Sequence, residues 1–150
     1  MIAIVILLEV LAICAHLALP LVRTSSLRAE AATITRDLQQ VRNAAAAVHA
    51  RGDSWPADEP PGKVPTALQS HLPPGFRFAH QDYQLDWESW ELPENSEVAP
   101  GSRHLAGIAV ITHDARVASS VAAQLRPGQL RFTIGNRTTL VIEETSAGTP

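Results

Sequence analysis

The 150-residue chain is poor in cysteine, in lysine and in clustered positive charge. Cys14 is the only cysteine, so no disulfide can form within the chain, and cysteine pairing gives no information about the cellular compartment. Lys63 is the only lysine, and no basic block occurs in a chain of formal net charge -3. This charge pattern gives no support for a nucleic acid as a partner.

The sequence also lacks the motifs that commonly mark a catalytic centre. It contains no phosphate-binding glycine-rich loop, no Gly-x-Ser-x-Gly and no His-Glu-x-x-His. Its six histidines are scattered, and none has metal-ligand spacing to a second candidate. We therefore predict no catalytic residue, no metal site and no cofactor, and we do not expect an enzyme.

Four acidic residues lie close together along the chain: Asp82, Asp86, Glu88 and Glu91. Oxygen-rich loops are typical of calcium sites, but Asp82 to Glu88 alternate along a predicted strand. The alternation favours a solvated strand face over a metal site. The neighbouring Trp87 and Trp90 are expected in the core or on an interaction surface.

Residues 2–22 are almost entirely apolar, and about 20 such residues suffice to cross a bilayer as a helix. A cleaved secretory signal would need a basic start, but no Lys or Arg precedes Arg23. A lipoprotein signal would use the sequence LAIC, where the bulky Ile13 stands at a position that calls for a small residue. We therefore expect residues 1–22 to be a retained transmembrane or assembly helix.

Glu9 and Pro20 interrupt this apolar run. An ionised carboxylate at bilayer depth costs about 3 kcal/mol, so the presence of Glu9 in an apolar helix needs an explanation. It can lie shallow, near the lipid headgroups, or it can pair with a positive group from another copy of the chain. Pro20 is expected to kink the helix or to mark a local break.

Residues 23–51 are predicted to form an amphipathic helix that continues the rod, with Gly52 as a natural stop. Apolar residues recur in steps of four and three and draw one continuous seam: Leu27, Ala31, Ile34, Leu38, Val41, Ala45 and Val48. A rod over 2–51 would be about 75 Å long, so its first half must project from the rest of the chain. The seam can pack on the chain's own globular head or on a neighbouring helix.

Residues 52–150 are predicted to form a globular head. Its expected elements are a loop at 52–65, a short helix at 66–72, a hairpin with strands around 76–78 and 83–87, a loop at 93–104, a buried strand at 105–112, a helix at 115–125 capped by Asp114, a hairpin at 130–144 with its turn at Gly135 and Asn136, and a frayed tail at 145–150. The expected fold class is α+β, with the long helix packed on a small, mainly antiparallel sheet of four or five strands.

The chain resembles the type IV pilin-like proteins, which include the type II secretion pseudopilins. The resemblance rests on LLEVLAI with Glu9, on Pro20 at the end of the apolar run, on the alanine-rich helix, and on RGDSWP at 51–56, which is similar to the Gly-x-aromatic-Pro exit of pseudopilins. It covers the first 56 residues best and the head only in outline. It implies that the apolar helices bundle as the core of a filament and that Glu9 meets the N-terminal amine of an adjacent subunit, which sets the register.

The resemblance implies a membrane-anchored, pilin-like subunit of a type IV pilus or a type II secretion pseudopilus. Its assembly seam would include Leu27, Ile34, Leu38 and Val41. Its partners would be the lipid bilayer and other pilin or pseudopilin subunits, and it would span a bacterial inner membrane once, with the head in the periplasm or outside the cell. The alternative is a single-pass protein whose extracytoplasmic head binds a ligand or a protein without polymerising.

Overall fold

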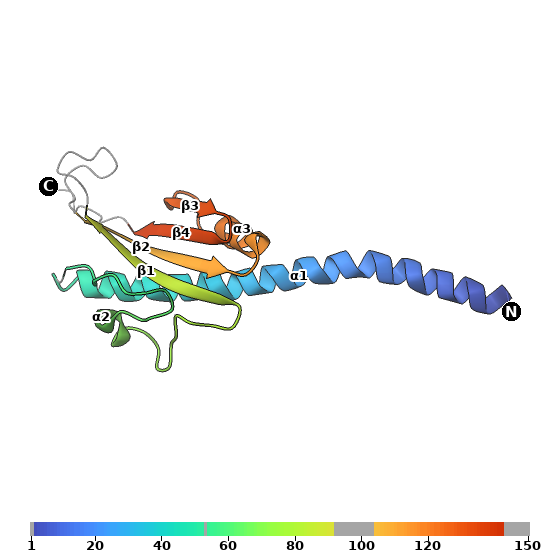
Figure 1. Ribbon diagram of the computed structural model, residues 1–150, viewed down its shortest axis with the longest axis horizontal. Coiled ribbons are helices and arrows are strands. Elements are labelled where there is room, and N and C mark those ends of the chain that lie inside the picture. Colours follow the sequence, from blue (N-terminus) through green and yellow to red (C-terminus); the bar gives the residue numbers. More distant parts are fainter. Residues whose placement is uncertain (1, 53, 92–103, 143–150) are drawn as a thin grey trace.

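The computed structural model describes residues 2–52, 54–91 and 104–142, with side chains from Thr24 onward. The elements follow in the order α1 (Ile2–His49), α2 (Thr66–Gln69), β1 (Tyr83–Glu91), β2 (His104–Thr112), α3 (Ala115–Gln124), β3 (Arg131–Ile134) and β4 (Arg137–Ile142). One long helix precedes a four-stranded antiparallel sheet (Figure 1). The predicted α+β class is confirmed.

Helix α1 is a single uninterrupted helix, and only its C-terminal half packs on the head (Figure 1). The helix continues through Pro20, so the predicted local break does not occur; a gentle bend along the projecting half accommodates the chain instead (Figure 1). The predicted stop at Gly52 is confirmed. The helix gives way to a turn in which the Gly52 amide donates to the His49 carbonyl at 2.9 Å, with Gly52 at a φ of 81°.

The apolar seam of α1 lies against the head. Ile34, Leu38 and Val41 have no exposed surface, and Leu27 is partly buried at the edge of the core. Alanines along the same stripe, such as Ala31 and Ala45, are also fully buried and let the sheet approach the helix closely. The seam therefore builds the core of this chain.

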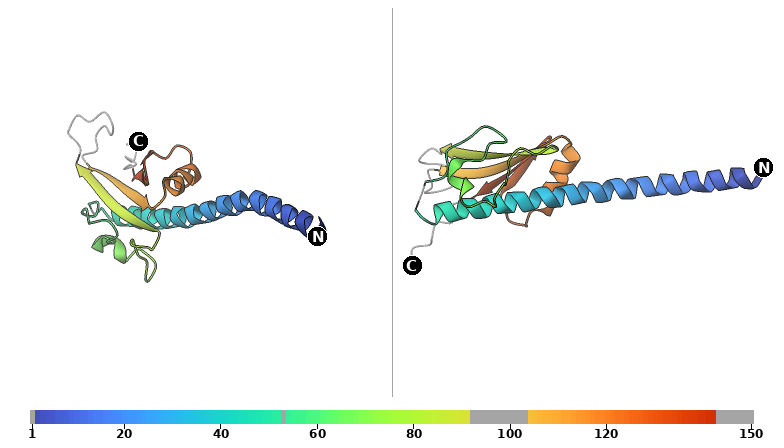
Figure 2. Two further views of the ribbon diagram at one scale, coloured as in Figure 1. Left: turned by 45° about the vertical axis from the view of Figure 1, so that its right-hand side comes forward. Right: turned by 90° about the horizontal axis from the view of Figure 1, so that it is seen from below.

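The sheet has the strand order β1-β2-β4-β3, and every neighbouring pair is antiparallel. Its inner face, towards α1, supplies large core side chains such as Leu85, Trp87, Ile108 and Leu140. Helix α3 packs on the same face, where the Thr138 hydroxyl donates to the Ala118 carbonyl at 3.0 Å. Figure 2 shows α1 running along this face and far beyond it. We call the opposite face of the sheet the outer face.

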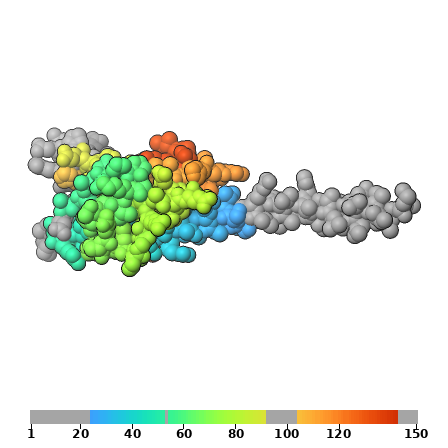
Figure 3. All heavy atoms as spheres, turned by 60° about the horizontal axis from the view of Figure 1, so that its bottom comes forward, coloured from blue at the N-terminus to red at the C-terminus, as the bar shows by residue number. Residues whose placement is uncertain are grey.

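The hairpin predicted from strands around 76–78 and 83–87 does not form, because only its second strand, β1, is present. Phe78 is fully buried, but its segment forms one isolated bridge, Ala79 with Gln84, and no strand. The cause lies just upstream, where Pro73 and Gly75 impose a turn whose Phe76 amide donates to the Pro73 carbonyl at 3.0 Å. The segment at 54–80 instead covers the side of the head next to β1 (Figure 3).

The second half of the head follows the prediction closely. The Asp114 side chain caps α3 by accepting from the Arg116 amide at 2.8 Å, and Gly135 turns the β3–β4 hairpin at a φ of 59°. The strand predicted at 105–112 is β2, which begins one residue earlier, at His104. Nearly all of the predicted loop at 93–104 and the whole predicted tail at 145–150 lie outside the described residues.

The predicted location in a membrane is wrong for the part of the chain that the structure describes. Among the residues whose side chains the structure describes, from Thr24 onward, no helix combines the length and the apolar character that crossing a bilayer requires, which contradicts a single-pass protein of the bacterial inner membrane. Helix α1 carries charged residues along its described side chains, including Arg28, Glu30 and Arg36. Each such charge costs about 3 kcal/mol at bilayer depth.

Candidate functional site

The residues proposed for assembly fall into two groups along α1. Glu9 and Pro20 belong to the first half of α1 by sequence, and that half projects beyond the head (Figure 1). Ile34, Leu38 and Val41 are fully buried in the head's own core, and Leu27 packs against that core. Of the two uses that the sequence left open for the seam, the structure therefore gives these four residues the first, packing on the chain's own head. The projecting half is the part of α1 that does not pack on the head (Figure 1).

Most of the contacts that the sequence did not predict lie on the outer face of the sheet. By register it presents Glu88 and Trp90 of β1 beside Gly107 and Ala109 of β2, and next to these Arg137 and Thr139 of β4. The central strand thus contributes only small residues at this point, which leaves a trough between β1 and β4.

Arg137 fills one end of the trough and links the two strands. Its Nη2 lies 2.8 Å from Oδ2 of Asp86 and also binds the Glu88 carboxylate. Asp86 is only 6% exposed, so the predicted solvated face is wrong at this position. A period-two pattern marks the face on which an acid lies, but it does not reveal an arginine two strands away that covers it.

Burial dominates the titration of this cluster. It raises the pKa of Asp86 and of Glu88 above their ordinary values, although hydrogen bonding and charge from Arg137 act in the opposite direction. Two carboxylates share one guanidinium, so Arg137 is committed within the chain. The cluster links β4 to β1 across the outer face of the sheet.

An apolar groove of about 490 Å³ occupies the rest of the outer face. Trp90 forms one wall and lies over Gly107, where an added Cβ would come within 2.6 Å of its ring. Leu130 and Phe132 form the other wall and are 46% and 47% exposed; Ile134, further along β3, is 73% exposed. Sequence patterning gives the alternation of these residues but not which face of the sheet α1 leaves uncovered.

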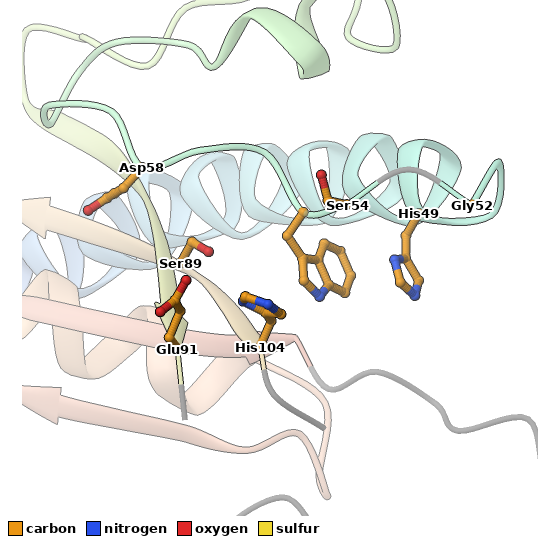
Figure 4. Close-up of a pocket in the computed structure, with 8 residues that line it drawn as sticks. His49, Gly52, Ser54, Asp58, Ser89, Glu91 and His104 are labelled. Atoms are coloured by element: carbon orange, nitrogen blue, oxygen red, sulfur yellow. The ribbon is translucent and has the colours of Figure 1, made fainter. Parts of the chain in front are cut away.

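A second, polar hollow of about 750 Å³ lies at the C-terminal end of α1 (Figure 4). Its lining comes from the end of α1, the following loop and the facing ends of β1 and β2: His49, Gly52, Ser54, Trp55, Asp58, Ser89, Glu91 and His104. The rings of His49 and Trp55 stack with centroids 4.3 Å apart. Figure 4 shows Glu91 and His104 near each other and His49 apart from both. Across the described residues, no three His, Cys, Asp or Glu side chains group as a metal site would require.

Comparison of the chain with protein-family models, with curated proteins and with solved structures found no match.

Proposed function

We propose that the chain is a pilin-like structural subunit, which joins other copies of itself or related subunits into a filament of the type IV pilus or type II secretion pseudopilus kind. The observation that carries this proposal is the length of α1, which runs from Ile2 to His49 while the head packs only on its C-terminal half (Figure 1). A long helix before a small antiparallel sheet is the architecture that the resemblance implies.

The sequence of the projecting half supplies the driving force. Residues 2–22 are almost entirely apolar, whereas the buried core of the head begins at Leu27 and Ala31. Removing apolar surface from water yields about 25 cal/mol per Å², so helices of this composition gain by packing against one another. A bundle of such helices, with the heads arranged around it, is a filament core.

Glu9 supplies the register in this proposal. A carboxylate inside an apolar bundle must be matched by a positive group from a neighbouring subunit, because burying it alone is costly. Such a pair mainly offsets its own desolvation, so it selects one axial position of the helices more than it adds net stability. No catalytic step and no cofactor enters the proposal.

The change of Glu9 to Gln tests the proposal directly. Glutamine keeps the shape and removes the charge, so we expect the concentration needed for assembly to rise by about tenfold, which corresponds to about 1.4 kcal/mol. Assembly is measured by sedimentation and electron microscopy of the purified full chain, and the fold of the head by circular dichroism. Glu30→Gln is the matched control, since it makes the same change further along α1, beside the head.

Two outcomes would count against the proposal. Unchanged assembly of Glu9→Gln would reject the register role of Glu9. A wild-type chain that stays monomeric at every concentration would reject the filament role itself and favour a head that binds a partner without polymerising.

A further inference from the structure

The two edges of the sheet differ in how they are protected. The β1 edge is covered at its start by the preceding segment: the Gly62 amide donates to the Leu85 carbonyl at 2.8 Å, and the Leu85 amide donates to the Phe78 carbonyl at 2.8 Å. The His80 amide donates to the Tyr83 carbonyl at 3.0 Å. These bonds occupy outward backbone groups of Tyr83 and Leu85 with which another strand would otherwise pair.

The β3 edge has no such cover among the described residues. The hairpin register and the bond from the Val141 amide to the Leu130 carbonyl, at 2.9 Å, direct the backbone groups of Leu130 and Phe132 towards β4. The N–H and C=O groups of Arg131 and Thr133 then point outward, and within the described ranges no backbone group bonds to them.

The side chains on the β3 edge are large, apolar and exposed, which is typical of a protein interface. Leu130, Phe132 and Ile134 are the large apolar residues that stand out as exposed in the described part of the chain, and all three lie on the outer face of the same strand segment. Natural edges are usually blunted by charge, proline or a bulge. Here the one charged residue, Arg131, folds back so that its guanidinium donates to the Arg126 and Gln129 carbonyls, each at 3.3 Å.

We propose that β3 pairs with β3 of a second copy of this chain, antiparallel and about a two-fold axis at Phe132. In this register Phe132 faces Phe132 of the second copy, and Leu130 faces Ile134 of the second copy. The outward N–H and C=O groups of Arg131 and Thr133 then bond to those of Thr133 and Arg131 across the axis. The two sheets become one continuous sheet of eight strands, twice the four of one chain.

The sequence of β3 favours a second copy over an unrelated strand, because it is self-complementary in this register alone. Centring the axis on Arg131 would place two arginines directly opposite each other, which destabilises a strand pair. Centring it on Thr133 would leave Leu130 without a partner. Only the axis at Phe132 pairs every exposed apolar side chain with another and sets each arginine against a threonine. This surface is separate from the projecting half of α1.

The first experiment measures self-association of the full chain in the Glu9→Gln background, which weakens assembly through α1, so that a difference caused by Thr133→Pro belongs to the β3 edge. Sedimentation equilibrium should show a dimer, and Thr133→Pro should raise its dissociation constant at least about tenfold. Proline removes the outward N–H of β3, which the pairing with β4 does not use. Thr133→Ala is the matched control, because it also loses the hydroxyl contact with Thr138 but keeps the N–H.

The second experiment fixes the register by cross-linking. In a Cys14→Ser background, Phe132→Cys should form a disulfide-linked dimer on mild oxidation, because facing residues at a non-hydrogen-bonded position have Cα atoms about 4.5 Å apart. Thr133→Cys, one position on, should cross-link far less, since it faces Arg131 of the second copy. Circular dichroism confirms that each variant is folded.

A monomer at concentrations up to about 1 mM would overturn the proposal, because an affinity weaker than this corresponds to only about 4 kcal/mol. Equal cross-linking of the two cysteine variants would overturn it as well. Either result would leave the β3 edge to an extended segment of a different protein. Neither would bear on filament assembly, which the Glu9 test addresses with the β3 edge unaltered.

Discussion

At the scale of single residues, the contact that fastens the sheet to α1 is a hydrogen bond between residues far apart in sequence. The hydroxyl of Tyr83, on β1, donates to the Asp37 carboxylate on α1, and the His80 ring stacks on Tyr83 with centroids 4.3 Å apart. Burial, and then the bond to Asp37 and its negative charge, raise the pKa of Tyr83 above its ordinary value of 10.0. Tyr83 is the only tyrosine of the chain, so its ionisation can be followed without overlap.

The raised pKa predicts a loss of stability in alkali. Above about pH 10 the tyrosine of the unfolded chain releases its proton while Tyr83 of the folded chain keeps it. The unfolded state then binds fewer protons, so the free energy of unfolding falls as the pH rises. Tyr83→Phe should cost about 1 kcal/mol at neutral pH and should lose less stability than the wild type between pH 9 and 11.

The measurement is urea unfolding of both proteins across that range, with tyrosinate absorbance of the wild type as an independent probe. Comparison with Tyr83→Phe cancels the titration of the groups that both proteins share. Parallel stability curves for the two proteins would show that Tyr83 ionises equally in both states.

Residue-scale contacts of this kind were the least predictable from the sequence. Asp37 and Tyr83 meet only once the helix and the sheet are packed. Arg137 and Asp86 meet because two small residues of β2 let the arginine cross it. Periodicity assigns each side chain to a face, but it does not tell which distant side chain shares that face.

At the scale of elements, sequence reasoning did well wherever a period was sustained. The seam of α1 is buried as its spacing predicts, and the predicted helix α3 buries Val117 and Val121, which lie four residues apart on one face. It failed at 76–78, where two alternating phenylalanines imitate a strand but follow a proline and glycine turn. The short pattern there reflects burial of Phe78 from a loop, and two alternating residues are too few to separate the two cases.

The contact between β1 and β2 on the outer face yields a prediction at this scale. An added Cβ at Gly107 would approach Trp90 to 2.6 Å and the Leu140 carbonyl oxygen to 3.2 Å. Gly107→Ala should therefore destabilise the fold by about 2 kcal/mol, because the indole must leave its position. In a Trp90→Leu background the same change should cost much less.

Chemical unfolding of the wild type, the two single variants and the double variant gives the coupling between the two positions. We expect a coupling of about 1 kcal/mol or more, as is usual for residues in contact. Strictly additive costs would mean that the backbone at Gly107, and not the indole, resists the methyl group.

At the scale of the whole molecule, the chain divides into a head with its own core and a helix that extends beyond it (Figure 1). The length of the predicted helix was enough to predict that part of it projects, because a head made from so short a chain cannot cover a rod of about 75 Å. The prediction of a membrane location was based on composition, and the described helices do not support it. Composition identifies an apolar stretch, but it does not identify what covers that stretch.

This division predicts that the head is independent of the projecting half. A chain that starts at Thr24 retains every residue of the described core, which begins at Ala31 with Leu27 packed against it. Its melting temperature should lie within about 4 °C of the full chain, equivalent to a change of about 1 kcal/mol or less, and it should not form filaments. Calorimetry and sedimentation of the two chains test both statements; a large fall in melting temperature would show that the head depends on the segment removed.

The covered β1 edge limits what any pairing at β3 can build. A sheet with two open sides can add molecules without end, whereas here the segment at 60–80 already occupies outward backbone groups of Tyr83 and Leu85 at the start of β1. Two molecules that join through β3 would therefore present a partly blocked edge on each outer side. This obstacle favours a closed pair over a growing ribbon and leaves filament growth to a different contact.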